Sequence, residues 1–165
     1  MYRSIDELKI RAKKLQKRLN AGESEILSAF KLDVSAAQDL RRKTCLNQIA
    51  KQVGFIDWNH AKITLSGMST PDSDMGKMWY SGQCTALLNN WFADYDEAQI
   101  YLAENPDMYL LPYKRQFMVV KDDFIKVIGL DQDCDEYWKK VNNNLVAAYG
   151  SNAWHELVWR RIQSY

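Results

Sequence analysis

The sequence is poor in the residues that most often form catalytic or metal centres. It contains only two histidines, His60 and His155, and three cysteines, Cys45, Cys84 and Cys134. The cysteines are widely spaced and form no CxxC pair, which argues against both a zinc site and a disulfide framework. No glycine-rich phosphate loop and no nucleophile elbow is present. We therefore name no catalytic residue, expect no metal site and no cofactor, and rank a small-molecule enzyme third among the possible functions.

Long apolar runs are also missing. The uninterrupted apolar stretches are a few residues long, far short of the roughly 20 residues that a membrane-spanning helix needs. The first residues lead into a charged helix and not into the apolar segment of a secretory signal. Unpaired cysteines without an export signal are typical of reducing compartments. We therefore expect a cytoplasmic protein that has no membrane partner.

The charge is balanced over the whole chain but not along it. The net charge of the 165 residues is +1. Residues 1–62 carry 13 Lys and Arg against 7 Asp and Glu, whereas residues 63–165 carry 9 against 14. The basic first third and the acidic remainder can either attract each other or present two surfaces to different partners, and the charge alone does not distinguish these arrangements.

The first 65 residues are predicted to be helical throughout. Ser4-x-x-Glu7 matches a capping box, which predicts the start of a helix that continues to Gly22. Its apolar residues recur at steps of three and four and form one stripe: Ile5, Leu8, Ala12, Leu15 and Leu19. Further helices are predicted over 24–31, 35–53 and 58–65. The helix over 35–53 has an apolar face of Leu46, Ile49, Ala50 and Val53, and Asp57 offers an N-cap for the helix over 58–65. We expect these stripes to pack together as one helical core.

The remainder of the chain has a different character. Residues 66–82 are rich in Gly, Ser, Asp and Met and are predicted to be a linker or surface loop. Beyond it, the short apolar run over 85–93 fits a strand or a helix. Strands are expected within 108–120 and helices over 94–102, 122–129, 135–147 and 151–163. The predicted fold class is therefore α+β and mostly helical. It consists of a basic helical bundle module (1–65), the linker (66–82) and an acidic, aromatic-rich α+β domain (83–165) with a short antiparallel sheet.

One segment of the basic module resembles a known helical module. Its residues Ile49, Ala50, Lys51, Gly54, Phe55 and Trp58 match the pattern I-A-[RK]-x-x-G-F-x-x-W. This pattern is similar to that of a short bacterial module that is appended to glyoxalase-superfamily and ankyrin-repeat proteins. The resemblance covers residues 4–65 and implies a bacterial accessory module without an activity of its own, while residues 66–165 resemble no family.

The same segment has the proportions of a helix-turn-helix over residues 46–65. Basic residues that would suit phosphate contacts accompany it. They are Lys13, Lys14, Lys17, Arg18, Arg41, Arg42, Lys43, Lys51 and Lys62. However, the second helix begins with Trp58, where a DNA-reading helix would present polar side chains. We therefore interpret this segment first as a plain helical packing unit and keep nucleic-acid binding as the alternative function.

The acidic part offers aromatic residues as a second kind of candidate site. Aromatic side chains supply much of the energy of protein interfaces, although they also fill cores. The residues that we expect to contact a partner are Trp79, Tyr80, Tyr109, Tyr113, Lys114 and Arg115. The partner would be another protein or a second copy of this chain. The leading prediction is therefore an accessory or protein-interaction protein without catalytic activity.

Overall fold

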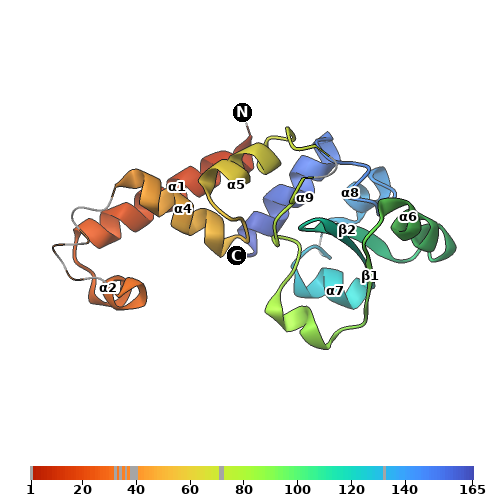
Figure 1. The fold of residues 1–165 in the computed structure, drawn as a ribbon, viewed down its shortest axis with the longest axis horizontal. Helices are drawn as coiled ribbons and strands as arrows, with labels where there is room; N and C mark the ends of the chain where they lie inside the picture. The colour runs from red at the N-terminus through yellow and green to blue at the C-terminus, as the bar shows by residue number, and fades with distance from the viewer. Residues whose placement is uncertain are drawn as a thin grey trace.

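The computed structural model describes residues 2–31, 33, 35, 37, 41–70, 73–131 and 133–165. Figure 1 shows helices grouped at one end of the molecule and a small sheet with further helices at the other. The long helix α9 (Asn152–Gln163) lies between the two groups and packs against both α1 (Arg3–Asn20) and α8 (Asp135–Lys140). The chain is α+β and mostly helical, as the sequence predicts.

Helices α1, α2 (Ser24–Phe30), α4 (Arg42–Gln52) and α5 (Trp58–Leu65) form the first group. The predicted apolar stripe of α1 is buried along its whole length and packs on α4. From the predicted helix over 35–53, Ile49 and Val53 are buried and Leu46 is partly buried. The structure starts this helix at Arg42, and residues 36 and 38–40 of the prediction lie outside the described residues.

The capping box predicted at Ser4 and Glu7 is wrong. Helix α1 begins two residues earlier, with Tyr2 at the N-cap position, and the carbonyl of Tyr2 accepts the N–H groups of Ile5 and Asp6. Ser4 lies inside the first turn and is buried. No side chain of the described residues caps the first turn of α1. This turn contacts α9 instead, where the Tyr2 ring lies 4.9 Å from the His155 ring. By contrast, Asp57 caps α5 as expected, accepting the His60 N–H at 2.8 Å.

The sheet consists of β1 (Asn89–Phe92), β2 (Tyr109–Tyr113) and β3 (Gln116–Val120) in the order β1-β3-β2, with antiparallel pairs. Helix α6 (Tyr95–Glu104), which Asp94 caps, covers one face and buries Leu110 and Val119. The other face carries Leu111, Met118 and Val120 into the main core. The predicted short antiparallel sheet within 108–120 is confirmed, and β1 adds an outer strand to it.

Helix α8 is shorter than the helix predicted over 135–147. It ends at Lys140 because Asn142 and Asn143 adopt a left-handed backbone, with φ of 49° and 54°. Asparagine tolerates this conformation better than most residues. The chain beyond it runs beside β2, where Leu110 donates to the Asn143 carbonyl at 2.8 Å and receives the Leu145 N–H at 3.0 Å. A short 3₁₀ helix (Gly82–Ala86) and α7 (Asp122–Val127) complete the elements of this end.

The main buried cluster runs through both groups of elements. It contains Leu8 and Leu65 from the helical group together with Trp79, Phe124 and Leu157. Gly54 allows the two groups to meet closely, since its φ is +97° and a Cβ there would lie 2.9 Å from the backbone of Lys77 and Met78. The N–H of Lys77 donates to the Gly54 carbonyl at 2.8 Å. Residues 77–79, within the segment predicted as a linker or loop, are therefore pressed against the turn between α4 and α5.

A buried arginine joins α9 to this segment. The Arg161 side chain donates to the carbonyls of Met78 at 2.6 Å and Ile128 at 3.2 Å, and to Ser164 Oγ at 2.8 Å. Its guanidinium lies 4.1 Å from the centre of the Tyr165 ring. No carboxylate among the described residues pairs with it. Burial lowers the pKa of Arg161. Backbone carbonyls and the Ser164 hydroxyl, and not a carboxylate of the described residues, accept the hydrogen bonds of its guanidinium.

Replacing this arginine tests its contribution to stability. We expect Arg161→Met to lower the free energy of unfolding by about 2–4 kcal/mol, because the buried carbonyls of Met78 and Ile128 lose a charged donor. Arg160→Met is the matched control on the same helix and should cost less than about 0.5 kcal/mol. Urea unfolding followed by tryptophan fluorescence measures both, and equal losses would contradict this role for Arg161.

Candidate functional site

Three aromatic rings from separate parts of the chain meet at the surface. Tyr80 precedes the 3₁₀ helix, Trp91 lies on β1 and Tyr113 ends β2. The ring centres of Trp91 and Tyr113 are 5.1 Å apart, and those of Tyr80 and Tyr113 are 5.5 Å apart, both nearly edge to face. Trp91 is 43% exposed, and Leu88, just before β1, is 69% exposed. We call Tyr80, Trp91, Tyr113 and the neighbouring Lys114 the aromatic surface.

The strand register explains how this surface forms. Trp91 pairs with Met118, which pairs in turn with Leu111, so Trp91 lies on the sheet face that enters the main core. Beneath the exposed rings, Tyr80 contacts the fully buried Phe124 with ring centres 6.1 Å apart. The aromatic surface is therefore an outward extension of the core. Its rings are held by their neighbours and do not hang free in solvent.

The structure brings together some of the predicted partner-binding residues and separates others. Tyr80, Tyr113 and Lys114 belong to the aromatic surface, and the Lys114 ammonium lies 5.7 Å from the centre of the Tyr113 ring. Arg115 is exposed beside them in the turn between β2 and β3. The exposure expected of Trp79 is wrong, because this side chain is fully buried by the close approach of residues 77–79 to Gly54.

Tyr109 lies at the opposite end of β2 from Tyr113. Its ring packs edge to face on Trp138 at 4.9 Å, and burial raises its pKa. The prediction grouped Tyr109 with Tyr113, but the structure places them apart. Sequence reasoning also missed Trp91 and Leu88, because the run from 85 to 93 fits a strand and a helix equally well. Only the strand assignment puts Trp91 on the same face as Tyr113.

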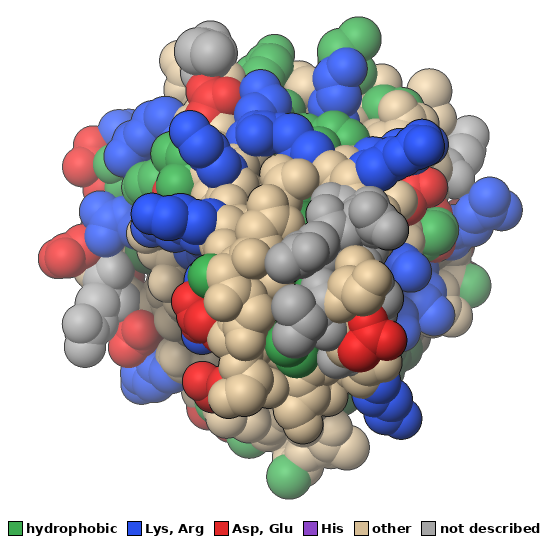
Figure 2. Space-filling view, turned by 90° about the vertical axis from the view of Figure 1, so that its left-hand side faces the viewer, with side chains coloured by type: hydrophobic (Ala, Val, Ile, Leu, Met, Phe, Trp, Pro, Cys, Tyr) green, Lys and Arg blue, Asp and Glu red, His purple; other side chains and the backbone are tan. Residues whose placement is uncertain are grey.

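The predicted basic residues are all exposed. They are distributed over α1 (Lys13, Lys14, Lys17, Arg18), the start of α4 (Arg41, Arg42, Lys43), its end (Lys51) and α5 (Lys62). Only Arg18 forms an ion pair with a described residue, at 2.6 Å from Glu23. Figure 2 shows Lys and Arg side chains around the end of the molecule that carries α2, interrupted by a few Asp and Glu. This end therefore presents a broad but discontinuous positive surface.

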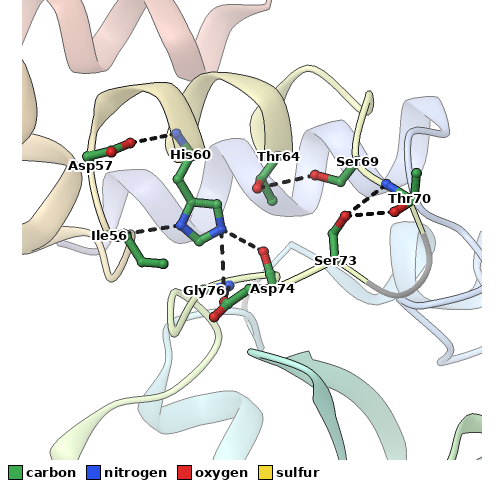
Figure 3. Close-up of polar contacts among 9 residues, drawn as sticks. All are labelled: Ile56, Asp57, His60, Thr64, Ser69, Thr70, Ser73, Asp74 and Gly76. Carbon is green, nitrogen blue, oxygen red and sulfur yellow. Dashed lines mark hydrogen bonds and ion pairs between the residues drawn. The ribbon is translucent and has the colours of Figure 1, made fainter.

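His60 forms a connected polar site with the turn before α5 and with residues 74–76 (Figure 3). The Ile56 N–H donates to its Nδ1 at 3.1 Å, which leaves the ring proton on Nε2. Nε2 donates to the Asp74 carbonyl at 2.6 Å and lies 3.9 Å from the Asp74 carboxylate. That carboxylate also accepts the Gly76 N–H at 2.8 Å. Both ring nitrogens are engaged with the backbone, so His60 fastens residues 74–76 to α5.

The second histidine lies in a different setting. His155 borders a cavity of about 330 Å³ with Tyr2, Arg3, Glu156 and Trp159. Arg3 is held there by Glu156 at 3.3 Å and by stacking on the Trp159 ring at 4.4 Å. Burial lowers the pKa of His155, which favours the neutral ring. Among the described residues, no hydrogen bond joins His155 to a hydroxyl or carboxylate, so the cavity shows no nucleophile-and-base pair.

The remaining reactive groups are shielded. Cys45, Cys84 and Cys134 are free and buried, and burial raises the pKa of each thiol. A higher pKa lowers the fraction of reactive thiolate. Within the described ranges, no group of three or more His, Cys, Asp or Glu side chains could hold a metal ion. None of the described helices is both long and apolar enough to cross a bilayer.

No protein-family model, curated protein or solved structure matches this chain. The resemblance of residues 4–65 to the appended bacterial module therefore stays a prediction.

Two variants test whether His60 in particular, and not any histidine of the chain, holds residues 74–76 against α5. We expect His60→Ala to lower the free energy of unfolding by about 1–3 kcal/mol, since it removes the donor to the part-buried Asp74 carbonyl. Amide exchange at Gly76 should become faster as the loop loosens. His155→Ala is the control and should leave the Gly76 rate unchanged. An unchanged Gly76 rate in both variants would show that His60 does not fasten this loop.

Proposed function

We propose that this is an accessory protein that binds a partner protein through the aromatic surface. The observation that carries the proposal is the exposed contact of Trp91 with Tyr80 and Tyr113, directly above the buried Phe124. Tryptophan and tyrosine dominate binding energy where they are clustered and supported by a packed layer. The proposed function is therefore recognition, without a chemical step.

The surroundings of the rings indicate what kind of partner fits. The half-exposed Trp91 ring offers apolar area to an aliphatic or aromatic side chain. Lys114 and Arg115 border them, and neither forms an ion pair with a described residue. A partner segment with an apolar side chain next to an acidic one would satisfy both features. Charged groups at the rim set the specificity and rate of association more than its strength.

Selection from a random library of 12-residue peptides tests this surface directly, because the library offers every kind of side chain to the rings. We expect enriched peptides to combine apolar and acidic residues. Their affinity should fall at least about tenfold for Trp91→Ala and for Tyr113→Ala, since truncating such an anchor costs more than 1 kcal/mol. Fluorescence polarisation of a labelled peptide measures the loss.

Ile100→Ala is the matched control, because Ile100 is 62% exposed on α6, away from the rings. This variant should bind the selected peptides as the unaltered protein does. A selection that enriches no peptide, or peptides that bind all three variants equally, would contradict the proposed function.

Nucleic-acid binding by the basic helices is the second candidate. The observation that favours it is the exposure of the whole predicted set, with only Arg18 paired to a described acidic residue. Free Lys and Arg side chains release counter-ions from a phosphate backbone when they bind it. The spread of these residues over α1, α4 and α5 favours contacts with phosphates more than reading of bases.

The dependence on salt distinguishes this candidate. If about four phosphates are contacted, affinity for a 20-base-pair duplex should fall roughly a hundredfold between 50 and 200 mM salt. Replacing Arg41, Arg42 and Lys43 together by Ala should weaken binding to every sequence alike. Replacing Lys121, Lys126 and Lys139 in the acidic part is the control. Absence of binding at 50 mM salt in a polarisation titration would exclude the candidate.

A further inference from the structure

The two outer edges of the sheet differ in whether their backbone is covered. The outer edge of β2 is bonded along its length: Leu110 exchanges hydrogen bonds with Asn143 and Leu145, and Lys114 does so with Met75 and Gly76. For β1, the backbone hydrogen bonds of the described residues include none to any segment other than β3. One edge is therefore bonded by the protein itself, and the other has no backbone partner among the described residues.

The bonds of β2 also determine which groups of β1 point outward. Leu110 uses its N–H and carbonyl away from β3, so its antiparallel partner Val119 must turn its own groups toward β1. Asn90 faces Val119 and is bonded to it. Because the direction alternates along a strand, Asn89 and Trp91 present their N–H and carbonyl groups to the outside. These are the groups that a further strand would pair with.

At four residues β1 is short, and shortness alone gives an edge some protection, but this edge lacks the other usual kinds. Exposed edge strands normally carry charged side chains, proline or a bulge that prevents pairing with another chain. The stretch from Leu88 to Ala93 contains no charged residue and no proline, and β1 pairs with β3 in a continuous register. Trp91 offers an outward backbone and a half-exposed ring at the same position.

We propose that the partner binds as an extended segment that adds to β1 as a fourth strand, at the edge of the aromatic surface. This inference rests on the proposed function and specifies the conformation of the partner. A strand beside β1 places the side chain opposite Trp91 on the same face as the indole ring. Backbone hydrogen bonds then supply affinity, and the aromatic surface selects the side chain.

The occupant is a segment of a different protein and not a second copy of this strand. The end of β1 that carries Trp91 lies next to the Tyr113–Lys114–Arg115 turn, which is basic and has no acidic partner among the described residues. A second copy of residues 88–93 would bring no carboxylate to this turn. A partner segment with an acidic residue beside its apolar one complements both the turn and the rings.

Alternate N-methylation of a selected 12-residue peptide tests strand addition on the unaltered protein. A strand directs every second N–H toward its neighbour. Methylating one alternate set of amides should therefore weaken binding at least tenfold, and methylating the other set should change it less than twofold. Equal loss for both sets, as in a helical peptide, or no loss for either would overturn strand addition while leaving the proposed function intact.

A pair of variants tests the same edge from the side of the protein. Asn89→Pro removes an outward N–H, whereas Asn89→Ala removes the same side chain and keeps the N–H. We expect Asn89→Pro to bind the peptide five- to tenfold more weakly than Asn89→Ala, with equal urea midpoints for the two. Equal affinity would overturn the inference.

Amide exchange provides a readout that needs no variant. In the free protein, Asn90 and Phe92 should be protected and Asn89 and Trp91 should exchange freely. Saturating peptide should slow exchange at Asn89 and Trp91 at least tenfold. Slow exchange at Trp91 in the free protein, together with a dimer in light scattering, would overturn the assignment of the occupant in favour of a second copy. If no peptide is enriched at all, both the inference and the proposed function fail.

Discussion

The buried guanidinium of Arg161 sets the geometry on which both ends of the molecule depend. A cation removed from water needs acceptors in fixed positions, and here they are the carbonyls of Met78 and Ile128. These acceptors come from the segment that precedes the sheet and from the end of α7. Their common attachment to α9 fixes where the chain enters the sheet region. Tyr80 lies two residues beyond Met78, so its position in the aromatic surface follows from the same attachment.

A second constraint acts on the same segment from the opposite side. Gly54 leaves room for the backbone of Lys77, and His60 holds the carbonyl of Asp74. Residues 74–80 are thus fastened to the α4–α5 turn, to α5 and to α9 by three kinds of interaction. Tyr80, at the end of this segment, is consequently held in place from several sides. Rigid anchors lose little conformational entropy on binding, which suits the recognition role that we propose.

Sequence reasoning was most successful where a single periodic pattern dominates. The stripe of α1, the cap at Asp57 and the hairpin within 108–120 follow from local rules, and the structure contains them. Trp79 was misjudged because its burial depends on Gly54, which lies 25 positions earlier, and no local pattern reveals that approach. Trp91 was missed because the role of its ring depends on the register between β1 and β3. Local sequence patterns do not reveal sites that are assembled from distant segments of the chain.

The edge of β1 also bears on how the protein would behave at high concentration. A strand with free hydrogen-bonding groups and exposed apolar side chains can template the addition of further chains, and this tendency grows with concentration. Free protein should therefore precipitate above a limiting concentration. Producing more of it than of the proposed partner that covers the edge would increase this risk. An accessory protein of the kind that we propose would best be made in step with its partner, so that the ratio of the two chains would itself be controlled.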